Sequence, residues 1–116
     1  MINRAAVLIR LRAPAVRWIN EADPSPGNKP ITLANANEER TVYLISDDAA
    51  ETKATFERWL KHNFAALFEA ELEGWYTDEG LWPKNRTLKL FREWFDIECH
   101  TVIEDTVEEE LYDDEI

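Results

Sequence analysis

Glycine is scarce in this chain: Gly27, Gly74 and Gly80 are the three glycines among 116 residues, and they do not cluster. The sequence therefore lacks the glycine-rich loops that hold the phosphates of nucleotides. It also lacks the Gly-x-Ser-x-Gly and His-Glu-x-x-His motifs of serine hydrolases and zinc proteases. These absences exclude the familiar sequence signatures of nucleotide binding, ester hydrolysis and metal-dependent proteolysis.

Cysteine and long apolar runs are also scarce. Cys99 is the single cysteine, so the chain forms no internal disulfide, and we expect a reducing compartment. The apolar run of residues 5–9 ends at Arg10 and is too short for a secretory signal, and no stretch approaches the roughly 20 apolar residues of a membrane span. The sequence predicts a cytoplasmic protein with no membrane partner.

Positive charge is in short supply, with 13 Lys and Arg against 24 Asp and Glu and a net charge of -11. Such a field repels phosphates, so we expect no nucleic-acid partner. The charge is uneven: residues 1–20 contain four arginines and no acid, whereas residues 96–116 contain ten acids and neither Lys nor Arg. These segments are either two solvated ends, or the acidic end pairs with the basic start, within one chain or between chains.

Hydrophobic residues make up 45% of the chain and aromatic residues 11%, which is typical of a globular protein. Periodicity predicts strands over residues 5–12, 41–46 and 97–103 and helices over residues 48–72 and 87–95. We therefore predict an α+β fold in which a small, about three-stranded sheet is covered on one face by a long helix and a second amphipathic helix. Residues 1–103 are predicted to form one globular domain, followed by an acidic tail over residues 104–116.

Three details of this assignment are open to direct test. The long connection over residues 13–40 contains Pro24, Pro26 and Gly27 and is expected to hold short helical turns at residues 15–20 and 33–39. The long helix is expected to begin with a capping box at residues 48–51, and either to kink near residues 62–63 or to pack against two surfaces. In the tail, Val107, Leu111 and Tyr112 have spacings that suit a marginal helix.

Cys99 and His100 suggest a nucleophile and base, but adjacent residues of a strand point to opposite faces, so we predict that they form no catalytic pair. Cys99 is expected to be a buried, inert thiol. Glu98, His100 and Glu104 share the other face. One histidine and ordinary acids fall short of a recognised ligand set, so we assign no metal and no cofactor.

Aromatic residues concentrate between residues 75 and 95, interspersed with charges, which is typical either of a core with a solvated rim or of a pocket or partner surface. We predict that Phe91 and Phe95 are core residues and that Trp82, in a loop between Gly80 and Pro83, is exposed for binding. The candidate binding residues are Trp75, Asp78, Trp82, Arg86, Trp94 and His100.

The sequence favours a small acidic interaction domain, such as an adaptor, an inhibitor or a regulatory domain, that binds a basic protein surface or a second copy of itself. The alternative is a small-molecule-binding domain or minor enzyme with a tryptophan-lined pocket. In that alternative Arg86 is the anion clamp and His100 or Asp78 transfers the proton. No residue is assigned as catalytic under the favoured hypothesis, which leaves enzymatic activity open.

Overall fold

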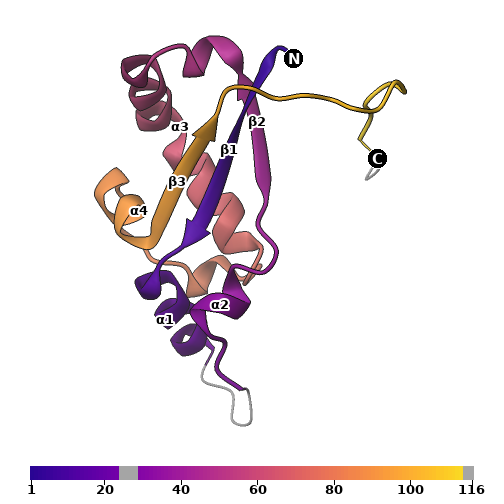
Figure 1. Ribbon diagram of the computed structural model, residues 1–116. Helices are drawn as coiled ribbons and strands as arrows, with labels where there is room; N and C mark the ends of the chain where they lie inside the picture. Colours follow the sequence, from indigo (N-terminus) through magenta and orange to yellow (C-terminus); the bar gives the residue numbers. More distant parts are fainter. Residues whose placement is uncertain (24–28, 114–116) are drawn as a thin grey trace.

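A computed structural model describes residues 1–23 and 29–113 of the chain. Its order is β1 (Arg4–Leu11), α1 (Ala13–Ala22), α2 (Leu33–Ala36), β2 (Val42–Ser46), η1 (Asp47–Ala50), α3 (Lys53–Glu73), η2 (Glu79–Leu81), α4 (Leu88–Trp94) and β3 (Phe95–His100). A three-stranded antiparallel sheet packs against the long helix α3 and shorter helices (Figure 1). The predicted α+β class is confirmed.

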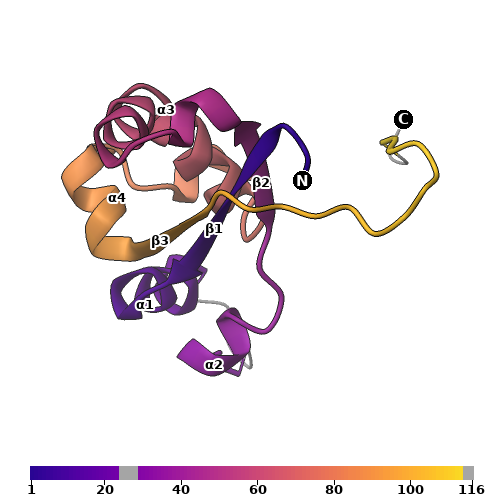
Figure 2. The same cartoon turned by 45° about the horizontal axis from the view of Figure 1, so that its top comes forward.

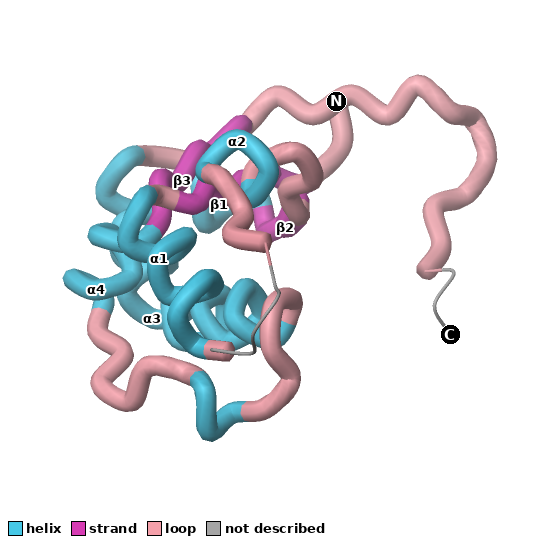
Figure 3. Tube along the Cα trace, turned by 90° about the horizontal axis from the view of Figure 1, so that it is seen from below, coloured by secondary structure: helices cyan, strands magenta, loops and turns pink. Residues whose placement is uncertain are grey.

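The sheet has the strand order β2-β1-β3, so β1 is its central strand. In the register, Ala5 is opposite Ile45 of β2, and Ile9 is opposite Ile97 of β3. The alternation of β1 divides its side chains between two faces. Ala5, Val7, Ile9 and Leu11 are buried on one face, whereas Arg4, Leu8 and Arg10 lie on the other and are exposed or half-buried. Helices α3 and α4 lie on the buried side of the sheet (Figures 2 and 3).

Helix α3 begins five residues later than the sequence predicted. Asp47–Ala50 forms the short 3-10 helix η1 instead of the first turn of α3. The capping box is supplied by Thr52 and Thr55: the Thr55 backbone N–H donates to Thr52 Oγ1 at 3.1 Å, and the Thr52 N–H donates to Thr55 Oγ1 at 2.9 Å. From there α3 is assigned as one helix through residues 62–63.

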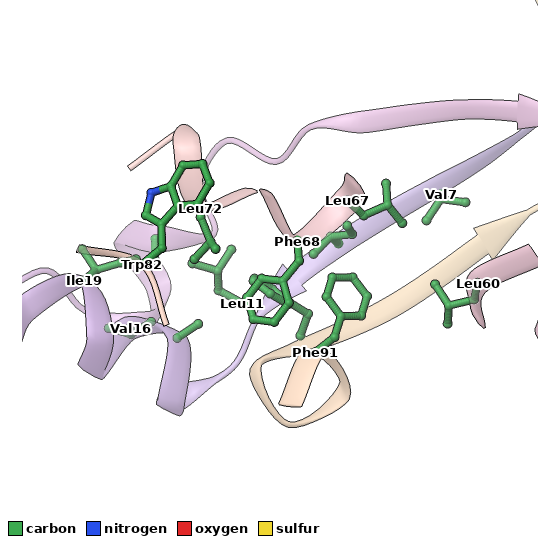
Figure 4. Packing of buried hydrophobic residues seen from close by; sticks show 14 of the residues in the cluster. Val7, Leu11, Val16, Ile19, Leu60, Leu67, Phe68, Leu72, Trp82 and Phe91 are labelled. Atoms are coloured by element: carbon green, nitrogen blue, oxygen red, sulfur yellow. The ribbon is translucent and has the colours of Figure 1, made fainter. Parts of the chain in front are cut away.

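The core is built around Phe68 of α3, which is fully buried (Figure 4). Its ring centroid lies 5.4 Å from that of Phe91, 5.7 Å from Trp94 and 5.6 Å from Phe95. Edge-to-face and tilted ring pairs at these distances are favourable beyond the area that they bury. The prediction that Phe91 and Phe95 are core residues is confirmed.

The connection into β3 differs from the prediction. Thr87 caps α4 as predicted, with its Oγ1 accepting from Leu90 N at 3.1 Å, but the helix ends at Trp94. Phe95 already belongs to β3, because its backbone is extended and pairs with Leu11. Strand β3 therefore covers Phe95–His100, and the predicted strand over residues 97–103 was placed too late.

Three further expectations are resolved in the described part of the chain. The first predicted helical turn is the full helix α1, with Pro14 in its first turn where proline is tolerated. The second is the four-residue helix α2. The predicted tail helix is wrong, because residues 101–113 form neither helix nor strand. Pro24, Pro26 and Gly27, like residues 114–116, lie outside the described residues.

Asn37, which precedes β2 in the chain, takes the place of a strand partner for the last residue of β1. Its side-chain Oδ1 accepts from Leu11 N at 2.8 Å, and its Nδ2 donates to Leu11 O and to Leu33 O, both at 3.0 Å. One amide thereby satisfies both polar groups of the last residue of β1 and ties α2 to the sheet. Among the described helices, none is both long and apolar enough to cross a bilayer.

Candidate functional site

The prediction that Trp82 is exposed is wrong. Its side chain is 8% exposed and forms part of the core, and its indole Nε1 donates to Tyr76 O at 2.7 Å. In Figure 4 it lies beside Leu72 and Ile19 at one end of the core. The loop that carries Trp82 has no helical or strand periodicity, yet it folds back onto the core and buries the indole there.

Arg86 and Asp78 serve the same loop. Arg86 Nη1 donates to Pro83 O at 2.9 Å, Nη2 donates to Glu69 Oε1 at 3.2 Å, and the guanidinium lies 5.7 Å from the centroid of the Trp82 ring. Asp78 caps η2 by accepting from Gly80 N at 2.9 Å. These contacts connect the loop to α3 and stabilise its turn, so the structure uses both side chains to hold Trp82 in place.

Trp75 is 38% exposed and lines a hollow of about 150 Å³ together with Glu71 and Arg40. Tyr43 Oη donates to Glu71 Oε2 at 2.5 Å beside this hollow. Burial raises the pKa of the Glu71 carboxyl, while the hydrogen bond from Tyr43 opposes the shift; burial and the Glu71 carboxylate together raise the pKa of Tyr43. The pair joins β2 to α3.

A larger hollow, of about 390 Å³, lies between α1, η2 and α4. The rings of Trp18 and Trp94 line it with their centroids 5.6 Å apart, and Arg17 and Glu21 lie at its rim. Trp18 Nε1 is already bonded to Leu81 O at 2.9 Å. Within the described residues, Arg17 makes no hydrogen bond or ion pair. The three predicted pocket tryptophans thus separate: Trp75 and Trp94 line different hollows, and Trp82 is buried.

Cys99 and His100 lie on opposite faces of β3, as strand geometry requires, with Val7 and Ala6 opposite them in the register. Cys99 is half-buried instead of fully buried, and its burial raises the pKa of the thiol, which disfavours the nucleophilic thiolate. His100 Nε2 lies 3.3 Å from Glu98 Oε2 on the exposed face, and Glu104 pairs with the N-terminal ammonium at 2.9 Å. Glu98 and His100 thus lie together while Glu104 is paired elsewhere, and the described residues contain no group of three or more side chains that could hold a metal ion.

The sheet is covered on one face, as predicted, but the sequence analysis did not consider which side chains the other, open face presents. Arg4, Leu8 and Arg10 of β1 lie on it, and so do Val42 and Leu44 of β2. Because the helices cover the other face, these apolar side chains remain exposed or half-buried. We call the set Arg4, Ala6, Leu8, Arg10, Val42 and Leu44 the β1–β2 strip.

The acidic tail leaves the end of β3 next to the N-terminus, where Ile2 N donates to Ile103 O at 2.9 Å. It then runs away from the sheet on the β2 side (Figures 1 and 2). Its large apolar side chains are exposed: Val107 by 61%, Leu111 by 74% and Tyr112 by 80%. The tail is therefore an extended segment that presents apolar groups among acids.

Sequence reasoning missed Trp18 and the β1–β2 strip. Trp18 lies in a segment expected to be a connection with a short turn, and its partners in the hollow come from segments more than sixty residues away. The alternation of β1 did show two faces, but the choice of the covered face depends on where α3 packs. No protein-family model, curated protein or solved structure matches the chain.

Proposed function

We propose that this chain is a small acidic protein-interaction domain and that residues 104–113 are its recognition segment. The observation that carries the proposal is the exposure of Val107, Leu111 and Tyr112 on an extended segment with no Lys or Arg. Large apolar side chains that remain together in water usually mark a binding surface. We place its role as an adaptor, inhibitor or regulatory domain in the cytoplasm, which suits the single free thiol Cys99.

The chemistry of the segment defines its partner. Its acids are Glu104, Asp105, Glu108, Glu109, Glu110 and Asp113. Complementary charge steers association and fixes register, whereas buried apolar anchors supply most of the affinity. The partner is therefore a protein surface on which an apolar groove is bordered by Lys and Arg.

The experiment uses the full chain and a labelled amphipathic peptide of lysine and leucine as the probe, with binding followed by fluorescence anisotropy. The double variant Leu111→Ser/Tyr112→Ser keeps every charge, and we expect it to weaken binding roughly ten-fold or more because the apolar anchors are gone. Leu33→Ser is the matched control, since Leu33 is exposed on α2 outside the tail, and it should bind as the parent chain does.

A second peptide, in which serine replaces leucine, reports the contribution of charge alone. The parent chain and the double variant should bind it equally weakly, and salt should abolish that binding. If the double variant binds the lysine and leucine peptide as tightly as the parent chain, the apolar side chains of the tail recognise nothing and the proposal is wrong.

The hollow between Trp18 and Trp94 supports a second candidate function, the binding of a small zwitterion. Arg17 and Glu21 lie one helical turn apart at the rim of the hollow, beside two indole rings. An amino acid with an apolar side chain matches this set, because its carboxylate complements Arg17, its ammonium complements Glu21 and its side chain packs on the indoles.

Calorimetric titration with free phenylalanine tests this candidate. We expect binding to be lost in Arg17→Gln and unchanged in Arg10→Gln, because Arg10 is equally a surface arginine but lies on the open sheet face. Phenethylamine, which lacks the carboxylate, should bind at least about ten-fold more weakly than phenylalanine. Equal heats for the two compounds, or for Arg17→Gln and the parent chain, would remove the candidate.

A further inference from the structure

The β1–β2 strip has the pattern of a docking groove for an extended acidic segment. Arg4 and Arg10 mark its ends, about 20 Å apart at the rise of a strand. Between them lie Leu8, which is half-buried, and the exposed Val42 and Leu44. The order along the strip is thus cationic, apolar, cationic.

Charge distinguishes the two halves of this open face. The β1–β2 half carries no acid, whereas the β3 half carries Asp96 and Glu98. Arg40 Nη1 lies 3.7 Å from Glu98 Oε1, and this ion pair marks the boundary of the strip at the Arg10 end. An acidic segment is therefore attracted to the β1–β2 half and repelled by the β3 half.

Residues 104–113 of the same chain have the complementary pattern. Acids at residues 104–105 and 108–110 border Val107, and acids border Leu111 and Tyr112 from both sides when the adjacent Asp113 is included. Ten extended residues span about 33 Å, enough to follow the full length of the strip. Among the described residues, the large apolar side chains of the tail are exposed, and neither Arg4 nor Arg10 of the strip forms an ion pair with an acid.

We propose that two copies of the chain exchange tails, with residues 104–113 of each copy lying along the β1–β2 strip of the other. The proposal rests on the proposed function, in that it names the partner of the recognition segment as a second copy of this chain. Reciprocal exchange about a twofold axis covers both tails and both strips and leaves a closed dimer.

The start of the tail favours a second copy over the chain's own strip. Glu104 is held by the N-terminal ammonium, and Ile103 O is held by Ile2 N. From these anchors the chain passes the upper ends of β1 and β2 and extends outward beyond β2 (Figure 1). Turning back onto its own strip requires a reversal directly after these anchors, whereas a second copy receives the tail in its extended form.

Sedimentation equilibrium of the full chain is the first measurement. We expect a dimer at low salt that dissociates on dilution and at high salt, because acid–arginine pairs at a surface are screened. Leu44→Asp places an acid in the strip, and Leu111→Asp removes an apolar anchor from the tail; each variant should be monomeric where the parent chain is dimeric. Leu33→Asp is the matched control, since Leu33 and Leu44 are both 46% exposed, and it should remain dimeric.

Mixing the two monomeric variants distinguishes a dimer formed by tail exchange from a dimer formed through any other contact. Leu44→Asp retains a working tail and Leu111→Asp a working strip, so the mixture should form a dimer with one intact exchange. A parent chain that is monomeric at every concentration overturns the proposal, as does a parent dimer that either variant leaves intact. A mixture that remains monomeric also overturns it, because the parent dimer then uses another contact.

The outcomes also separate this inference from the proposed function. If the chain is monomeric but its tail still binds the lysine and leucine peptide through Leu111 and Tyr112, the recognition segment stands and its partner is a different protein. If the chain neither dimerises nor binds the peptide, both proposals fail. Peptide binding is measured on diluted chain, because tail exchange competes with the peptide.

Discussion

Replacing Trp82 by alanine is expected to lower the free energy of unfolding by roughly 3 to 5 kcal/mol, as much as Phe95→Ala. Both side chains are buried, with exposed fractions of 8% and 4%, and each belongs to the hydrophobic core. The Trp82 variant also leaves Tyr76 O without its 2.7 Å donor and the Arg86 guanidinium without the ring beside it. A cavity and a lost hydrogen bond therefore act together.

Denaturant unfolding followed by circular dichroism measures this effect. Trp75→Ala is the matched control, because Trp75 is 38% exposed and its truncation should cost far less. Trp82→Phe keeps most of the apolar volume but loses the hydrogen-bond donor. Its decrease in unfolding free energy should therefore lie between those of Trp82→Ala and Trp75→Ala. If Trp82→Ala proved as mild as Trp75→Ala, the loop tryptophan would not contribute to the core.

The second large effect is expected for Asn37→Leu, which should cost about 2 to 3 kcal/mol. Leucine has a similar volume but neither donates nor accepts, so Leu11 N and Leu11 O lose their partners at the end of the central strand. A part-buried polar group left without a partner costs about 1 to 3 kcal/mol. The contact to Leu33 O, which holds α2 to the sheet, is lost as well.

Asn35→Leu is the matched control for this position. Asn35 lies two residues away and its side-chain amide donates at 3.2 Å to Glu38 within the same turn, on the exposed surface. Its replacement should change the unfolding free energy by less than about 0.5 kcal/mol. Asn37→Asp keeps the acceptor for Leu11 N but loses both N–H donors. Its decrease in unfolding free energy should therefore lie between those of Asn35→Leu and Asn37→Leu. Equal stabilities of the Asn37 and Asn35 leucine variants would show that Asn37 is not a strand partner.

At the candidate site, the sequence indicated which polar residues lie near aromatic ones but did not indicate what those polar residues contact. Asp78 and Arg86 were predicted as binding residues because they lie among aromatic ones, whereas the hydrogen bonds that they form go to Gly80, Pro83 and Glu69 and serve the loop. Composition does not distinguish a polar residue that binds a ligand from one that holds a turn. The distinction depends on which acceptors the folded chain brings within about 3 Å.

The sequence by itself determined the class of fold, the buried alternation of β1, the cap at Thr87 and the burial of Phe91 and Phe95. These features follow from periodicity and local hydrogen bonding, which are set by residues within one or two turns of each other. Only the tertiary structure decided that Trp82 is buried, that Trp18 and Trp94 line one hollow and that α4 gives way to β3 at Phe95. Each of these depends on contacts between segments far apart in the chain, and local patterns show which side of an element is apolar but not which neighbour covers it.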